Sequence, residues 1–177
     1  QRQMCIRDRL LSALRMLENR DNLPPLRVVF QWPDDIRTPD DEILRFDPED
    51  FSDSAIEIFK ITEPLTSDAY QNLLLRSDAI VLPYLRQAYF ARISGVAVEA
   101  MLLGIPVIYT KDTWNADMID EYGAGLDFPN EDVAGLANAI VQLIESIPKY
   151  KASAANQATK AREHFSKENF QHALWEG

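Results

Sequence analysis

The chain has 177 residues, of which 46% are hydrophobic and 26% charged, so it is long enough for one globular domain with a substantial core. It carries 18 basic and 28 acidic residues, and a surface with a net charge of −10 disfavours binding to nucleic acid or to anionic lipid. The sequence holds no long uncharged apolar run and begins with polar residues, so we expect neither a membrane span nor a secretory signal. A single cysteine, Cys5, cannot form an internal disulfide, which predicts a reducing, cytoplasmic location.

The first nine residues, 1–9, follow neither a helical nor a strand period. They resemble the translation of a transposon-end sequencing adaptor, so we interpret them as an assembly scar or a disordered N-terminus. On the scar interpretation the gene continues upstream. The predicted domain then comprises residues 10–177 and is incomplete at its N-terminus.

Helical and strand patterns alternate through the rest of the chain. Leu10, Leu14 and Leu17 recur at helical spacing, and this helix is expected to end near Asn22. Short apolar runs predict strands at 26–30, 56–59, 79–82, 107–109 and 126–128. Further helices are predicted at 66–76, 95–103, 115–122, 133–147, 151–164 and 167–175.

Particular residues mark the ends of these helices. Thr66 offers N-cap chemistry, Asn130 is expected to cap the long helix, and Gly104 is expected to end its helix in a left-handed conformation. The segment 31–54 is rich in Asp, Glu and Pro and is interpreted as an acidic loop, with a short helix predicted over 40–46.

The predicted strands are continuous apolar runs, which is typical of a parallel sheet covered on both faces. The expected fold class is therefore α/β, with a Rossmann-like doubly wound parallel sheet. Ligands of such sheets bind beyond the carboxyl ends of the strands. The loops that follow Leu82 and Tyr109 are accordingly among the first places to search for a site.

One of these loops leads into a helix with the features of an anion site. The helix predicted to begin at Ser94-Gly95 presents free backbone N–H groups and the positive end of its dipole. Gly95 lets a phosphate approach the backbone, and the Arg92 guanidinium can bind phosphate oxygens in a bidentate manner. Glu99 lies one turn further along, where a carboxylate can accept hydrogen bonds from a ribose diol.

Each of these residues also has a purely structural interpretation. Ser94-Gly95 is a common capping pair, and Arg92 can form an ion pair with Glu99 or Asp78. An ionised Glu99 on a largely buried helix would need a partner. Their combination at the end of one strand favours a ligand site.

The motifs resemble a known family. The string Ser-Asp-Ala-Ile-Val-Leu-Pro-Tyr at 77–84, Glu-Ala at 99–100 and Gly-Ile-Pro-Val-Ile at 104–108 resemble the C-terminal, donor-binding domain of GT-B glycosyltransferases. The similar enzymes are of the glycogen-synthase type, the "glycosyl transferases group 1". Segments 130–140 and 165–166 continue the resemblance.

The resemblance implies roles for several residues. The second glutamate of the family's Glu-x7-Glu motif binds the donor ribose and matches Glu99, and the Gly-rich turn that binds the diphosphate matches 92–96. The first glutamate falls on Ala91, so the expected sugar contact is missing. The string resembles a bacterial variant in which Arg92 replaces part of that contact.

The implied substrate-binding set comprises Tyr84, Tyr89, Arg92, Ser94, Gly95, Val96 and Glu99. Tyr84 or Tyr89 is expected to pack on the donor, and no catalytic residue is assigned. Trp114 either walls the donor site or packs under the loop. No cofactor or bound metal is expected, since His164 and His172 lack partners at metal-ligand spacing.

The implied activity is that of a retaining hexosyltransferase that uses a nucleoside-diphosphate sugar. Its N-terminal acceptor domain is missing on the scar interpretation, so the fragment alone is expected to be inactive. One alternative is a nucleotide-sugar epimerase of GT-B architecture, which the absence of histidines before His164 disfavours. Another is a flavodoxin-like regulatory or binding domain, for which Asp34-Asp35 is only a loose match.

Overall fold

A computed structural model describes residues 2–18, 20–31, 36–37, 43–44, 51 and 55–169. The strands are β1 (Leu26–Gln31), β2 (Ile36–Arg37), β3 (Ile43–Leu44), β4 (Ile56–Ile61), β5 (Ile80–Leu82), β6 (Val107–Thr110) and β7 (Gly125–Phe128). The helices are α1 (Arg2–Glu18), α2 (Ser67–Leu75), α3 (Arg86–Tyr89), α4 (Gly95–Leu103), α5 (Trp114–Tyr122), α6 (Val133–Glu145) and α7 (Ile147–His164).

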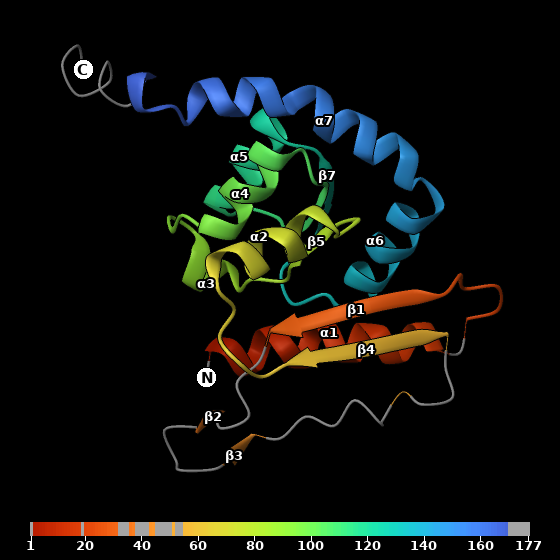
Figure 1. Ribbon diagram of the computed structural model, residues 1–177. Helices are drawn as coiled ribbons and strands as arrows, with labels where there is room; N and C mark the ends of the chain where they lie inside the picture. The colour runs from red at the N-terminus through yellow and green to blue at the C-terminus, as the bar shows by residue number, and fades with distance from the viewer. Residues whose placement is uncertain are drawn as a thin grey trace.

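Most of the described strands pair in parallel, as the apolar runs predicted. β1 pairs with β4 in parallel, and β5, β6 and β7 form a second parallel sheet in that order (Figure 1). β2 and β3 form a small antiparallel pair within the segment predicted to be an acidic loop. The fold class is thus α/β with parallel strands, although the described strands are divided between two parallel sheets rather than joined in one.

The three-stranded sheet is covered by helices on both faces. On β6, Val107 and Tyr109 belong to a core cluster formed with α4, α5 and the end of α7, whereas Ile108 belongs to a cluster formed with α1 and α6. Successive strand residues point to opposite faces, so this division places helices on either side of the sheet. All four residues of β6 are buried. The sheet is therefore doubly wound around β6, as the sequence predicted.

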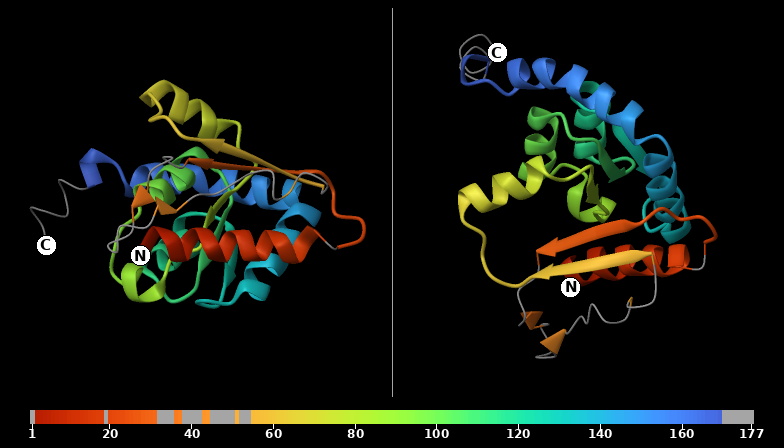
Figure 2. Two further views of the ribbon diagram at one scale, coloured as in Figure 1. Left: turned by 90° about the horizontal axis from the view of Figure 1, so that it is seen from below. Right: turned by 45° about the vertical axis from the view of Figure 1, so that its right-hand side comes forward.

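The β1–β4 pair differs, because the described elements cover only one of its faces. Val28 and Ile58 pack into the core, whereas the alternating residues Val29 and Phe59 are 39% and 38% exposed. The Arg27 guanidinium lies 4.5 Å from the centre of the Phe59 ring on this outer face. Figure 2 shows the pair lying alongside α1, apart from the three-stranded sheet.

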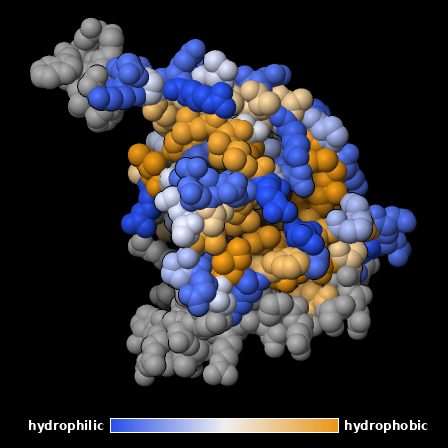
Figure 3. Space-filling view, viewed as in Figure 1, coloured by the Kyte–Doolittle hydropathy of each residue, from blue (hydrophilic) through white to orange (hydrophobic). Residues whose placement is uncertain are grey.

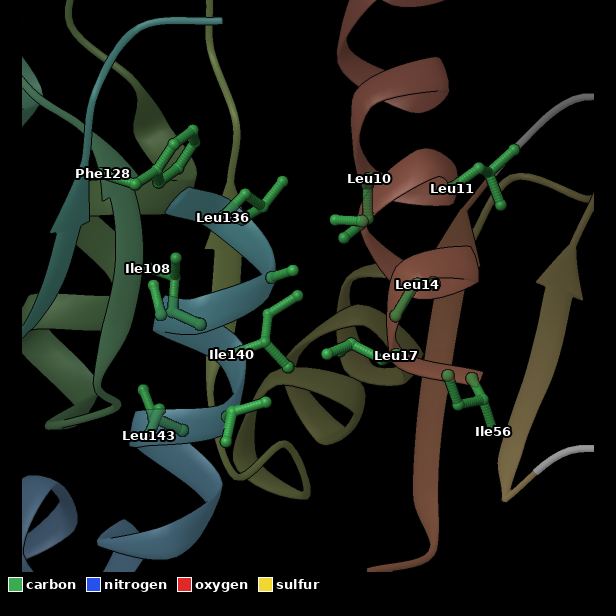
Figure 4. Packing of buried hydrophobic residues seen from close by; sticks show 14 of the residues in the cluster. Leu10, Leu11, Leu14, Leu17, Ile56, Ile108, Phe128, Leu136, Ile140 and Leu143 are labelled. Atoms are coloured by element: carbon green, nitrogen blue, oxygen red, sulfur yellow. The ribbon is translucent and has the colours of Figure 1, made fainter. Parts of the chain in front are cut away.

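Helix α1 links the two parts of the structure. Its leucines pack between α6 and strand β4, as Figure 4 shows for Leu14, Leu17 and Ile56. The helix begins at Arg2, eight residues earlier than predicted, and ends at Glu18 rather than near position 22. The origin of residues 1–9 as a scar stays a prediction.

The helix caps follow the expected side-chain chemistry with one exception. Thr66 and Ser94 each accept a hydrogen bond from the backbone three residues ahead, and Gly104 adopts φ 69°, as predicted. The prediction for Asn130 is wrong, because Asp132 caps α6 instead. Asp132 stands directly before the helix, so its carboxylate reaches the first free N–H groups, which Asn130 is two residues too early to do.

Other predicted boundaries also move. The long apolar stripe predicted one helix over 133–147, but Ser146 divides it between α6 and α7. The helix predicted at 40–46 is wrong where the structure describes it, because Ile43–Leu44 form strand β3 through pairing with β2. The rest of 40–46, most of 167–175 and His172 lie outside the described residues. Among the described helices, none is long and apolar enough to cross a membrane. Figure 3 shows hydrophilic residues over α2 with hydrophobic residues around them.

Candidate functional site

The predicted site lies where two neighbouring parallel strands end and two helices begin. β5 ends at Leu82 and is followed by α3 and α4, while β6 ends at Thr110 and is followed by α5 (Figure 1). The N-caps Ser94 and Thr113 are both buried. Parallel strands bring these helix N-termini to the same edge of the sheet, which is where doubly wound folds bind ligands.

The loop between β5 and α4 contains the short helix α3, which the sequence did not predict. The rings of Tyr84 and Tyr89 stack on each other with centroids 3.8 Å apart and planes within 6°. The Arg92 guanidinium lies 5.9 Å from the centre of the Tyr89 ring, and its side chain is exposed. The structure therefore brings Tyr84, Tyr89 and Arg92 together, with the two tyrosines packed on each other.

Ser94 joins this loop to the start of α4. Its hydroxyl lies 3.0 Å from the Tyr84 hydroxyl and accepts a hydrogen bond from the N–H of Ala97 at 3.3 Å. Burial raises the pKa of Tyr84, and the bond to Ser94 opposes this rise only in part. Ser94 thus has the capping role considered as its structural interpretation, and it also fixes the tyrosine pair.

The first turn of α4 is open beside this cap. The Ser94 hydroxyl and carbonyl accept from Ala97 and Val98, which leaves the N–H groups of Gly95 and Val96 to point out of the first turn. Gly95 is exposed, and a β-carbon placed on it would meet no atom within 4 Å. An anion can therefore approach this backbone closely, where the helix dipole favours it.

Glu99 has the partner that its position requires. The Tyr70 hydroxyl on α2 donates a hydrogen bond of 2.6 Å to Oε2 of Glu99, and both side chains are half-buried. Burial raises the pKa of the Tyr70 phenol, and the bond to the Glu99 carboxylate raises it further. The Tyr70 phenol therefore stays protonated at ordinary pH and continues to donate its hydrogen bond to the Glu99 carboxylate. Glu99 can accept further hydrogen bonds, since a carboxylate has about four acceptor positions.

Asn115 is a site residue that the sequence reasoning missed. Its side chain is 1% exposed. Its Oδ1 accepts from the N–H of Ser94 at 3.1 Å, and its amide donates to the carbonyl of Arg92 at 3.4 Å. It therefore holds the backbone on either side of position 93 from the first turn of α5. A polar residue beside the Thr113 cap was the only signal, and it does not specify a partner 21 residues away.

Arg9 is a second residue that the sequence reasoning set aside. It is 7% exposed, and its guanidinium donates to the carbonyl of Pro83 at 3.0 Å. The Thr110 hydroxyl donates to the neighbouring carbonyl of Tyr84 at 2.7 Å. These contacts fix the chain as it leaves β5. Arg9 belongs to the segment 1–9, which the sequence analysis excluded from the fold.

The ion pairs considered for Arg92 do not form in the described part of the chain. Asp78 pairs with Lys151 instead, and Glu99 bonds to Tyr70. Arg92 therefore keeps an exposed guanidinium within a few residues of the open turn of α4. Although the chain as a whole is acidic, this edge of the sheet offers an exposed guanidinium and a helix N-terminus to an anion.

Trp114 and His164, which the sequence analysis also considered, make contacts within the fold. The backbone N–H of Trp114 donates to the carbonyl of Phe90 at 3.1 Å, which ties α5 to the β5–α4 loop, and its side chain is half-buried. The His164 ring stacks on Tyr122, with centroids 4.0 Å apart. Over the described residues, no group of three His, Cys, Asp or Glu side chains is placed to hold a metal ion.

Comparison with known proteins gives one family match and several similar structures. A family model described as glycosyl transferases group 1 matches residues 46–146, more than half of the chain. No curated protein matches the sequence. The structure resembles sucrose-phosphate synthase from Thermosynechococcus elongatus with a TM-score of 0.61 and 18% identity. It also resembles Anabaena HepE in complex with UDP-glucose, with a TM-score of 0.52 and 22% identity.

These likenesses extend over only part of the similar proteins. The match to the synthase covers 96% of this chain and 42% of that chain. The match to the Anabaena protein covers 69% of this chain and 32% of that chain. At identities of 22% and 18%, these structural matches show a shared fold and nothing about function. The chain thus spans less than half the length of each of these two similar proteins.

Proposed function

The chain belongs to the glycosyl transferases group 1 family, and from this membership we propose that residues 10–177 are the donor-binding domain of a glycosyltransferase. The domain binds a nucleoside-diphosphate sugar at the carboxyl edge of its sheet, and a second domain supplies the acceptor site. The transfer retains the anomeric configuration, takes place in the cytoplasm and requires that second domain. This chain alone is therefore inactive.

One observation carries the proposal, which is the open first turn of α4 beside the exposed guanidinium of Arg92. The free N–H groups of Gly95 and Val96 and the exposed guanidinium of Arg92 are the groups that bind a diphosphate. In a sugar transfer the nucleoside diphosphate leaves with negative charge, so these groups stabilise the leaving group where its charge develops. The UDP-glucose complex of the similar Anabaena protein agrees with this class of donor.

The other predicted residues extend the site from the diphosphate. Glu99 accepts hydrogen bonds from the ribose diol one turn further along α4. Tyr89, stacked on Tyr84 and next to Arg92, offers an aromatic surface for the base or the sugar. Ala91 cannot supply the polar contact of the family's first glutamate, and Arg92 takes over part of that contact.

The experiment is a calorimetric titration of the chain with UDP, GDP and ADP, with Arg92→Ala as the test variant. Arg92 bonds to a charged group, so its removal weakens binding about 10- to 100-fold, the equivalent of about 1.5–3 kcal/mol. Arg76→Ala is the matched control, because Arg76 is an exposed arginine at the other end of β5, at the C-cap of α2. The proposal fails if none of the three nucleotides binds, or if both variants bind as the wild type does.

A further inference from the structure

The hydrogen bond between Tyr70 and Glu99 connects the predicted ribose-binding carboxylate to a helix that contains none of the predicted site residues. Tyr70 lies on α2 and Glu99 on α4, 29 residues apart, and the two atoms are 2.6 Å apart. We propose that Tyr70 is a positioning residue that holds the Glu99 carboxylate for a ribose diol and so sets the preference for ribonucleotides. The inference rests on the proposed donor site.

The hydrogen bond from Tyr70 limits the conformational freedom of the Glu99 side chain. A glutamate on a helix has several rotatable bonds, so an unattached carboxylate samples many positions. The Tyr70 hydroxyl donates to Oε2 alone. It therefore restrains the position of Oε2, while Oε1 can still accept hydrogen bonds from ligand hydroxyls. A diol then meets an acceptor that is already oriented, which lowers the entropy lost on binding.

Tyr70 is itself held rigidly by its surroundings. The Tyr70 side chain packs against the core cluster that contains Leu74, Ala100 and Met101. Helix α2 begins at the Thr66 cap, whose hydroxyl accepts from the N–H of Ala69 at 3.3 Å. The phenol is thus held by packing and by a capped helix, which is what a positioning residue needs.

The Tyr70 phenol must also be uncharged to hold the Glu99 carboxylate. A phenol that stays protonated can donate to a carboxylate, whereas a phenolate would repel it. Burial and the nearby carboxylate both raise the pKa of Tyr70, so the donor persists over the whole physiological range. Because Tyr70 adds no charge, it orients Glu99 without neutralising it. The carboxylate can therefore still accept charge-assisted hydrogen bonds from the diol.

The test compares each of UDP, GDP and ADP with its 2′-deoxy form, in calorimetric titrations of wild type and Tyr70→Phe. The wild type is expected to bind the ribo form about tenfold or more tightly, because the deoxy form lacks one hydroxyl that bonds to a carboxylate. In Tyr70→Phe this ratio falls to about threefold or less, while affinity for the deoxy form stays within about twofold. A residue that only stabilises the fold would change both affinities together.

Tyr109→Phe is the matched control. Tyr109 also donates its hydroxyl to a carboxylate, that of Asp120, but this bond lies along α5 away from its first turn. The control is expected to keep the wild-type preference for ribose. An unchanged ratio in Tyr70→Phe overturns the inference alone, as does tighter binding of the ribo form, which would mean that Tyr70 blocks Glu99. Absence of nucleotide binding to the wild type overturns the donor-site proposal as well.

Discussion

Replacing Asn115 with alanine tests whether one buried amide holds the β5–α4 loop. The substitution removes the acceptor for the N–H of Ser94 and the donor to the carbonyl of Arg92. Ser94 is 6% exposed, so its N–H loses its partner in a place that water does not reach freely. Arg92 is exposed, and its carbonyl can be hydrated instead.

The expected magnitude follows from these two environments. A buried donor without a partner costs about 1–3 kcal/mol, and the hydrated carbonyl costs little, so the loss is about 2 kcal/mol. Alanine is a better helix former than asparagine by roughly 0.5 kcal/mol, which leaves a net destabilisation of about 1.5 kcal/mol. For a chain of this size, Tm should fall by about 3–6 °C. Nucleotide binding should weaken too, since the backbone beside Arg92 is released.

The assay is thermal and urea unfolding of Asn115→Ala beside Asn138→Ala. Asn138 is exposed on α6 and loses the same atoms on truncation. Both substitutions remove the same side-chain atoms from a helix, so their difference chiefly reports the two hydrogen bonds of Asn115 and should be about 2 kcal/mol. A difference below about 0.5 kcal/mol would refute the view that Asn115 fixes this loop.

Three further predictions concern the glycines at the two ends of α4 and the stability of the chain at alkaline pH. Gly104→Ala should destabilise the chain by about 2 kcal/mol, because φ is 69° and its β-carbon would lie 3.0 Å from Cα of Ala155. Gly95→Ala should raise the free energy of unfolding in urea by about 0.4–1 kcal/mol, because alanine restricts the unfolded chain and its methyl group meets no protein atom. Yet it should weaken UDP binding, because that methyl group enters the space proposed for the phosphate. The raised phenol pKa values of Tyr70 and Tyr109 contribute stability that is complete below about pH 10 and lost above it. Urea unfolding from pH 9 to 11 should therefore show a shallower loss in Tyr109→Phe than in wild type.

The sequence predicted the central sheet because that part of the fold is determined by local patterns. β5, β6 and β7 are short apolar runs, and the residues that end and begin their helices, Ser94 and Gly104, act within three or four positions of themselves. A capping side chain reaches only the nearest turn, so its role is visible in sequence. The same reasoning failed at Asn130, where two polar residues competed and Asp132 was closer to the helix.

The position of β1–β4 was less predictable. Its residues alternate between buried and exposed, yet Val29 and Phe59 on the exposed face are as apolar as those on the buried face. An apolar run therefore predicts coverage on two faces, whereas the described elements cover one. The division of the strands into two sheets is a property of long-range pairing, which hydrophobic periodicity does not report.

Some residues of the candidate site could be predicted from the sequence, whereas their hydrogen-bond partners could not. Arg92, Ser94, Gly95 and Glu99 were found because they lie within eight positions of one another at the end of a strand, and the structure keeps them there. Burial of the helix also implied that Glu99 needs a partner, but not which residue supplies it.

Tyr70 supplies that partner from a different helix, and Asn115 supports the loop from a third. Each hydrogen bond joins residues more than twenty positions apart, so it exists only after the strands have brought their helices together. The groups proposed to touch a ligand are therefore local in sequence, whereas the groups that fix their geometry are distant. This difference explains why a motif can identify a donor site without revealing how selective the site is. If Glu99 binds a ribose diol as proposed, selectivity depends on how rigidly its carboxylate is held, and Tyr70 donates the hydrogen bond that holds it.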